Sequence, residues 1–335
     1  MSRLRQFIVA ASLAVVSHAA SAGFSGLYVF GDSLSDSGNL ALVIGADPAQ
    51  VITGNTYIPS KPYASGQFTN GNVWARDYAT AIGLSSFGLP SLAGGGDYAF
   101  GGARVATDGS GLPPSLAAQT GMFLSGHGGV ASSTALYVIA GGGNDARDTL
   151  VAAATAVALS QDPTPIIGAA ALAYAQATGA LIDQLQAAGA QRIVVWDVPD
   201  LGKAPAVTAA GAGASFLGTA IASAMNLALA GRVGIEGPNV SIFDIFGLQD
   251  LFVANPGAFG FIDVTHACGA PSNNCDPATA LSWDGIHPTA AAHLAIADAM
   301  LTAVPEPAEY ALMVAGLALI GARLRRRPQA ARVAA

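Results

Sequence analysis

Short apolar runs alternate along the chain with longer alanine-rich stretches. Each short run is bounded by glycine, proline or polar residues, which is typical of buried strands. The predicted strands cover residues 27–30, 135–140, 192–198 and 240–243, with a further short strand within 92–106. The alanine-rich stretches predict helices at residues 149–159, 166–188, 212–230 and 289–303. This alternation predicts a parallel sheet with helices on both faces.

Glycines and a long loop divide these elements. Gly189 and Gly231 are expected to end the second and third of the predicted helices. Residues 35–72 are rich in Gly, Asn, Pro, Ser and Thr, which predicts a loop, and a helix follows from about Val73 and Trp74. Long loops in compact domains are usually functional, so we expect part of a substrate pocket here; a disordered insertion is the alternative.

Composition narrows the class of protein. The chain has 335 residues, of which 52% are hydrophobic and only 10% are charged, enough apolar material for one large domain with a substantial core. Its formal net charge of −7 argues against a nucleic-acid partner. An acidic body also disfavours tight contact with anionic membrane surfaces.

The N-terminal segment, residues 1–22, has the parts of a secretory signal peptide. Arg3 and Arg5 precede an apolar stretch, and Ala20-Ser21-Ala22 is the expected cleavage site, which would leave Gly23 as the new N-terminus. A buried core helix is the alternative. The three parts in this order favour export of the chain.

The C-terminal segment is also distinct. Pro305-Glu306-Pro307 precedes an apolar run, residues 310–321, that is shorter than the ~20 residues of a membrane span, and a cluster of arginines follows. We therefore expect a domain of residues 23–304, then a segment of residues 305–328 and a tail of residues 329–335.

Small polar residues follow the ends of several predicted strands, and the carboxyl edge of a parallel sheet is where open α/β folds bind ligands. Four such motifs occur along the chain: Gly31-Asp32-Ser33-Leu34, Gly101-Gly102-Ala103, Gly142-Gly143-Asn144-Asp145 and Asp284-Gly285-Ile286-His287. A serine, a histidine and a carboxylate are the parts of a nucleophilic hydrolase. Taken alone, Asp32, Ser33 and Ser35 could instead cap a helix that begins near Leu34.

In this order the four motifs resemble the four blocks of the GDSL esterase/lipase family, also called SGNH hydrolases, over residues 24–303. The resemblance implies a three-layer α/β/α fold with a parallel, flavodoxin-like sheet of five strands. It also implies a secreted serine esterase or lipase that hydrolyses a small-molecule or lipid ester through an acyl-enzyme, with no metal or organic cofactor. The alternative is a surface-displayed binding or structural protein that keeps the fold without turnover.

The family pattern assigns roles to three residues. Ser33 is the expected nucleophile, His287 its general base, and Asp284 the carboxylate that holds the imidazole. Asp32 is expected to form local hydrogen bonds. Ser35 stands where the G-x-S-x-G motif needs its second glycine, which argues against an α/β-hydrolase proper.

The same pattern implies an oxyanion hole. Its expected donors are the backbone N–H groups of Ser33 and Gly101 and the side chain of Asn144, with Gly102 as the alternative to Gly101.

A competing motif overlaps the third block. Gly141, Gly143 and Ala146 fit G-x-G-x-x-A, a dinucleotide fingerprint. That fingerprint needs an acidic residue at the end of the next strand, and Asp162, at about the required distance, lies between Gln161 and Pro163 instead. The nucleotide interpretation is therefore the weaker one.

Cys268 and Cys275 are the only cysteines. An even count in an exported chain predicts a disulfide; a two-cysteine metal site is the alternative, but no CxxC pair supports it. His266 is expected at a loop surface, and His293 is expected to be structural.

The C-terminal segment resembles the PEP-CTERM sorting signal of Gram-negative bacteria. The resemblance implies transient membrane anchoring through this segment and processing by an exosortase-type enzyme. It also implies export through the inner membrane to the cell surface or the exterior, with the arginines kept inside. A plain C-terminal membrane anchor is the alternative.

Overall fold

A parallel sheet of four strands lies within the computed structural model, which describes residues 23–108, 113–304, 316–317 and 320. The strands are hydrogen-bonded in the order β1 (Leu27–Gly31), β2 (Leu136–Ala140), β3 (Ile193–Trp196) and β4 (Val240–Phe243). All three neighbouring pairs are parallel. Their carboxyl ends therefore meet at one edge of the sheet.

Residues 25–303 form one compact unit. The expected signal peptide, residues 1–22, and the tail, residues 329–335, lie outside the described residues. So does nearly all of the expected sorting segment, residues 305–328.

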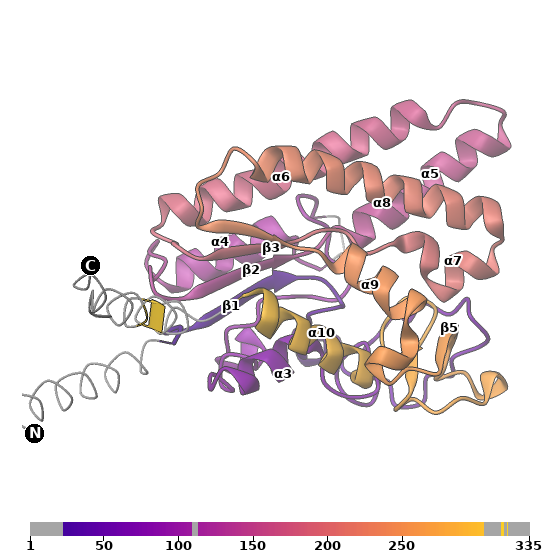
Figure 1. Cartoon of the computed structure of the whole chain (residues 1–335), viewed down its shortest axis with the longest axis horizontal. Helices are drawn as coiled ribbons and strands as arrows, with labels where there is room; N and C mark the ends of the chain where they lie inside the picture. Colours follow the sequence, from indigo (N-terminus) through magenta and orange to yellow (C-terminus); the bar gives the residue numbers. More distant parts are fainter. Residues whose placement is uncertain (1–22, 109–112, 305–315, 318–319, 321–335) are drawn as a thin grey trace, which may run out of the picture. The chain divides into compact units, whose positions relative to one another are not determined.

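Helices cover both faces of the sheet, which is why β1, β2 and β3 have unbroken apolar runs rather than alternating patterns, whereas Ser241 of β4 is exposed. In Figure 1, α6 (Thr164–Ala187) and α8 (Ala212–Val233) lie on one side of the sheet, and α3 (Trp74–Ala81) and α10 (Ala290–Ala303) lie on the other. The remaining described helices are α2 (Asn39–Ile44), α4 (Leu116–Gly126), α5 (Gly143–Ala158), α7 (Pro205–Ala209) and α9 (Ile245–Ala254). The predicted three-layer α/β/α class is confirmed.

The predicted count of five strands is wrong, because the expected strand within residues 92–106 forms only isolated bridges. Asp97 pairs with Val29 of β1, and the backbone N–H of Tyr98 donates to the carbonyl of Val29 at 2.8 Å. On the other side of this segment, Asn39 Nδ2 donates to the carbonyls of Asp97 and Ala99 at 2.7 and 3.0 Å. The next rung of a parallel ladder would need the backbone N–H of Gly31, which donates instead to Gln119 Oε1 at 2.9 Å, so the segment follows the edge of β1 without becoming a strand.

Several predicted helix boundaries also shift. The helix expected from residue 149 begins at Gly143, so the motif around Asn144 lies inside the first turn of α5. The helix expected to end at Gly231 continues to Val233, which is buried. Gly189 does follow the end of α6, with a positive φ of 114°, as a glycine after a helix commonly has.

The helices α6 and α8 are long and apolar enough to cross a membrane by length and composition alone. Ile182 and Leu185 of α6 and Ile221 and Met225 of α8 are instead buried in the main core with the strands. Packing within the compact unit therefore accounts for one face of each helix, whereas Leu172 of α6 and Phe216 and Leu227 of α8 are exposed.

A small second sheet carries the disulfide. The strands β5 (Asp263–Ala267) and β6 (Ala280–Ser282) are parallel, and Cys268 is bonded to Cys275 in the connection between them. The predicted disulfide is confirmed, and the alternative of a two-cysteine metal site is wrong. Because β6 leads directly to Asp284, the covalent loop braces the segment that delivers this carboxylate.

Candidate active site

Ser33 lies in a tight turn at the carboxyl end of β1. The backbone N–H groups of Ser35 and Asp36 donate to the carbonyl of Asp32 at 3.1 and 3.0 Å. The carboxylate Oδ1 of Asp32 accepts from the backbone N–H of Leu34 at 3.0 Å. The turn does not continue as a helix near Leu34, because the next helix, α2, begins at Asn39. Asp32 makes the local hydrogen bond that was expected of it.

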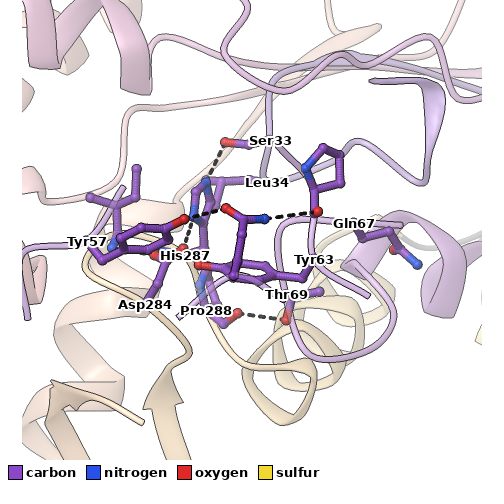
Figure 2. Close-up of polar contacts among 12 residues, drawn as sticks. Ser33, Leu34, Tyr57, Tyr63, Gln67, Thr69, Asp284, His287 and Pro288 are labelled. Atoms are coloured by element: carbon purple, nitrogen blue, oxygen red, sulfur yellow. Dashed lines mark hydrogen bonds and ion pairs between the residues drawn. The ribbon is translucent and has the colours of Figure 1, made fainter. Parts of the chain in front are cut away.

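Ser33, His287 and Asp284 form one chain of hydrogen bonds. Ser33 Oγ lies 2.9 Å from His287 Nε2, and His287 Nδ1 lies 2.6 Å from Asp284 Oδ2. Figure 2 shows the two contacts as dashed lines that join the three side chains in sequence. Because the carboxylate only accepts, it fixes the proton on Nδ1 and leaves Nε2 as the acceptor that faces the serine hydroxyl.

Asp284 is fully buried and all of its hydrogen-bonding capacity is directed inward. Its Oδ1 accepts from the backbone N–H groups of Ile286 and His287 at 2.8 and 2.7 Å. Its Oδ2 accepts from His287 and from the hydroxyl of Tyr63 at 2.7 Å. The Asp-x-x-His spacing thus lets the aspartate close its own turn and hold the imidazole at the same time.

Tyr63 is the residue of this constellation that sequence analysis missed. It lies in the long segment of residues 35–72, as does Thr69, whose hydroxyl donates to the carbonyl of Pro288 at 2.9 Å (Figure 2). Phe68 of the same segment has its ring centroid 5.3 Å from that of His287. Burial and the adjacent Asp284 carboxylate raise the pKa of Tyr63, so the hydroxyl stays protonated and donates. The segment expected to contribute to a pocket therefore also contacts Asp284 and His287.

Asn144 lies in the first turn of α5 and faces the same region. Its Nδ2 donates to the carbonyl of Ala103 at 2.9 Å, and its Oδ1 accepts from Arg147 Nη1 at 3.0 Å. An amide nitrogen carries two protons, so one N–H of Asn144 is left for a ligand. The contacts at both ends of the amide fix which way it points.

Gly101, the expected backbone donor, has its N–H occupied. It donates to the buried carboxylate of Asp36 at 2.8 Å, so it is unavailable for a ligand. A side chain at Gly101 would also collide with Phe68, because a Cβ there would lie 2.0 Å from the ring. Gly102 has a positive φ of 83° and lines the pocket in front of Ser33. The geometry thus favours Gly102, the alternative, over Gly101.

A pocket of about 490 Å³ opens in front of Ser33 and His287. We call it the wide pocket. Its wall is mainly apolar and includes Leu40, Val43, Ile44, Ile58, Pro59, Phe68, Leu92, Phe100, Pro113, Pro114 and Ile286. A smaller recess, of about 70 Å³, lies against Ser33 as well and is lined by the more polar side chains of Asp32, Asp200 and Gln249. Asn144 and Arg147 line both.

Buried carboxylates hold the turn and the adjacent loops. Burial raises the pKa of Asp32 and of Asp36 to about 6, and raises that of Asp97 well above its ordinary value. Asp36 accepts from the backbone N–H groups of Gly38 and Gly101, and Asp97 from those of Ser37 and Ala99. These contacts are structural, because they connect the turn of Ser33 to the segment that contains Ala99 and Gly101.

The dinucleotide interpretation loses its remaining support. Asp162 is exposed and precedes α6, where its carboxylate accepts from the backbone N–H of Thr164 at 2.9 Å, so it does not end a strand. Gly141, the first glycine of the fingerprint, is required by packing, because a Cβ there would lie 2.6 Å from Leu116. Of the other two histidines considered, His266 lies at the surface beside Asp263, and His293 is buried on α10.

His293 gives a test of stability against pH. Neither ring nitrogen has a hydrogen-bond partner among the described residues, and burial lowers the pKa of His293 to about 3, with the neighbouring His287 adding to the effect. Between pH 6.5 and 3 the unfolded chain therefore takes up a proton here that the folded chain does not, so folding weakens as pH falls. Relative to His293→Gln, the wild type is expected to lose about 3 kcal/mol of unfolding free energy between pH 7.5 and 4.5.

The measurement is urea unfolding of both proteins at the two pH values. The comparison with the variant is needed because the raised pKa values of Asp36 and Asp97 act in the opposite direction and are common to both proteins. Identical pH dependence in the two proteins would contradict the prediction.

Comparisons with known proteins bear on the activity. The family model described as GDSL-like lipase/acylhydrolase matches residues 27–300. A GDSL esterase/lipase of Arabidopsis thaliana is 26% identical, over 82% of this chain and 87% of its own length. The esterase EstA of Pseudomonas aeruginosa is 28% identical over 90% of this chain and 50% of its own, so the chain spans about half the length of that relative. A crystal structure of an extracellular lipase from Streptomyces rimosus is 23% identical, over 82% of this chain and 99% of that one, with a TM-score of 0.41.

Proposed function

The chain belongs to the GDSL-like lipase/acylhydrolase family, and on that premise we propose that it is a serine esterase or lipase that hydrolyses carboxylic esters through an acyl-enzyme on Ser33. One observation carries the proposal: the continuous hydrogen-bonded chain from Ser33 Oγ through His287 to Asp284, with contacts of 2.9 and 2.6 Å. A free hydroxyl is a weak nucleophile, and an adjacent base held by a carboxylate is the arrangement that activates it.

The proposed reaction has two steps. In the first, Ser33 Oγ attacks the ester carbonyl and its proton passes to His287 Nε2, which then delivers that proton to the leaving alcohol. In the second, His287 removes a proton from water as the water attacks the acyl-enzyme, and the proton returns to Ser33 as the carboxylic acid leaves. Asp284 stabilises the imidazolium in both steps without itself taking the proton.

The oxyanion of each tetrahedral intermediate would be held by three donors. They are the backbone N–H groups of Ser33 and Gly102 and the amide of Asn144. Gly102 replaces Gly101 because the N–H of Gly101 is bonded to Asp36. Donors that are already fixed in place stabilise the transition state without reorganisation.

Asn144→Ala is expected to lower kcat by about 10²–10³ while KM moves little, because the amide would act chiefly in the transition state. The measurement is steady-state hydrolysis of a soluble 4-nitrophenyl ester. The variant also loses the contacts of Asn144 to Ala103 and Arg147, so its unfolding must be measured beside its activity. An unchanged kcat in a folded variant would remove Asn144 from the oxyanion hole.

The wide pocket supports the assignment of an acyl chain to this side of the site, because most of its lining residues are apolar. The test is hydrolysis of 4-nitrophenyl esters of increasing acyl length by the full chain, with Ser33→Ala as the control. Turnover that rises with chain length before it falls would fit a pocket of about 490 Å³. Absence of Ser33-dependent turnover on any ester would leave the binding-protein alternative and sink the proposed activity.

We also propose that the enzyme is exported and sorted. Arg3, Arg5 and Ala20-Ser21-Ala22 support a cleaved signal peptide, and Pro305-Glu306-Pro307 with the following apolar and arginine-rich segments supports PEP-CTERM sorting by an exosortase-type enzyme. The enzyme would then act at the surface or exterior of a Gram-negative cell. Intact-mass analysis of the exported protein should give Gly23 as the first residue; a retained Met1 would contradict cleavage.

A further inference from the structure

Arg147 is a cation at the active site with no carboxylate paired to it. It lies on α5, one turn beyond Asn144, and its one hydrogen bond among the described residues runs from Nη1 to Asn144 Oδ1 at 3.0 Å. No described carboxylate oxygen lies within 4.0 Å of its guanidinium. Arg104 makes the contrast, because its guanidinium contacts both carboxylate oxygens of Asp148, at 2.9 and 3.0 Å.

Because Arg147 is partly buried, the lack of a carboxylate partner among the described residues leaves its charge poorly compensated. Arg147 is half-buried, and desolvation lowers its pKa, which means that the charged form has lost hydration that nothing has fully replaced. A guanidinium has five N–H donors in a planar fork suited to carboxylates and phosphates. Only one of these donors has a partner among the described residues.

The wide pocket determines on which side a partner would bind. Apart from Arg147 and His287, no lining residue of this pocket is ionisable, and none is acidic. The smaller recess, in contrast, is lined by Arg147 together with Asp32 and Asp200, which would repel an anion. An anionic group is therefore best accommodated in the wide pocket, next to the apolar wall.

We propose that Arg147 binds an anionic group of the substrate, so that the preferred esters combine an apolar chain with a carboxylate or phosphate close to the scissile ester. The proposal rests on the proposed esterase function and adds the class of substrate to it. The guanidinium of Arg147 donates to Asn144 Oδ1, whereas the proposed oxyanion donor is Nδ2 of the same amide. The anion and the oxyanion would therefore lie at opposite ends of the Asn144 amide. Carboxylate and phosphate share the chemistry that Arg147 recognises, and the test separates them.

The kinetic test compares matched ester pairs on the full chain. Mono(4-nitrophenyl) adipate is set against 4-nitrophenyl hexanoate, and 1-hexanoylglycerol 3-phosphate against 1-hexanoylglycerol. In the wild type the anionic member of at least one pair should have the higher kcat/KM, and the pair that shows it identifies the anion. Arg147→Gln should lower that preference by about 10- to 100-fold, the size of one charge-assisted contact, and Arg147→Lys should retain part of it.

Arg192→Gln is the matched control. It removes the same charge from an exposed position just before β3, at the opposite edge of the sheet, so the preference should persist. Arg147→Gln keeps a donor for Asn144 Oδ1, and the ratio of the two esters cancels any change in the positioning of Asn144. Equal loss on both esters of each pair, or no preference in the wild type, would overturn anion binding by Arg147.

A binding measurement separates this inference from the proposed activity. In Ser33→Ala, calorimetric titration with hexyl phosphate should give a Kd at least 10-fold lower than with hexan-1-ol, and adding Arg147→Gln should abolish the difference. If no ester is turned over but this difference is found, the proposed function fails and the anion site stands. If esters are hydrolysed but neither the ratio nor the binding depends on Arg147, only the anion site fails.

Discussion

Ser33→Ala is expected to lower kcat for ester hydrolysis by about 10⁴–10⁶ with little change in stability. Ser33 Oγ is the atom that faces His287 Nε2 at 2.9 Å, and no water molecule held in its place could form an acyl-enzyme. The fold does not depend on this hydroxyl, because the turn is held by the carbonyl and carboxylate of Asp32. Steady-state hydrolysis of a 4-nitrophenyl ester and urea unfolding of the same sample measure both effects.

Covalent labelling gives an independent measurement of the same assignment. A 4-nitrophenyl alkylphosphonate should modify Ser33, as seen by peptide mass, and should leave Ser33→Ala unlabelled. Ser85→Ala, an exposed serine on the loop after α3, is the control and should label as the wild type does. Turnover close to wild type in folded Ser33→Ala, or labelling at another serine, would remove Ser33 from the mechanism.

Asp284→Asn is expected to lower kcat by about 10³–10⁴. Both carboxylate oxygens accept hydrogen bonds, Oδ1 from two backbone N–H groups and Oδ2 from His287 Nδ1 and Tyr63. An asparagine must place its NH₂ group against one of these sets of donors. If the NH₂ faces His287, the imidazole proton moves to Nε2 and the base is lost.

Tyr63→Phe is the matched comparison for Asp284→Asn. It removes one hydrogen bond from Asp284 Oδ2 and leaves the carboxylate and its bond to His287 in place. Its kcat should fall by about tenfold or less, the size of one ordinary hydrogen bond. If folded Asp284→Asn retained kcat within tenfold of wild type, His287 would not depend on Asp284 for its tautomer.

Local sequence patterns were sufficient to predict the four strands of the sheet and to find the motifs around Ser33, Asn144 and His287. The strands β1, β2 and β3 have unbroken apolar runs because helices cover both faces, and that signal needs no knowledge of the rest of the chain. The fifth strand failed for a non-local reason. Whether the segment at Asp97 extends β1 depends on Gln119, whose side chain accepts the backbone N–H of Gly31 that the next rung would need.

Tyr63 was missed by sequence analysis, and Gly101 was expected to be a free donor, for the same reason. Tyr63 touches Asp284 across 221 positions of the chain, and the N–H of Gly101 is occupied by Asp36 across 65. No spacing along the sequence encodes such pairs, because both depend on how the segment of residues 35–72 folds over the carboxyl edge of the sheet. The choice between Gly101 and Gly102 could only be made once that contact was known.

The separation of Ser33 from His287 has a consequence for biogenesis. The two residues are 254 positions apart, one just after β1 and the other just before α10. A chain made from its N-terminus therefore presents Ser33, the proposed nucleophile, long before His287, its proposed base. A chain that stops before His287 lacks the proposed base, so its Ser33 should not be activated toward esters. Under the proposed mechanism, ester hydrolysis would therefore require synthesis at least as far as His287.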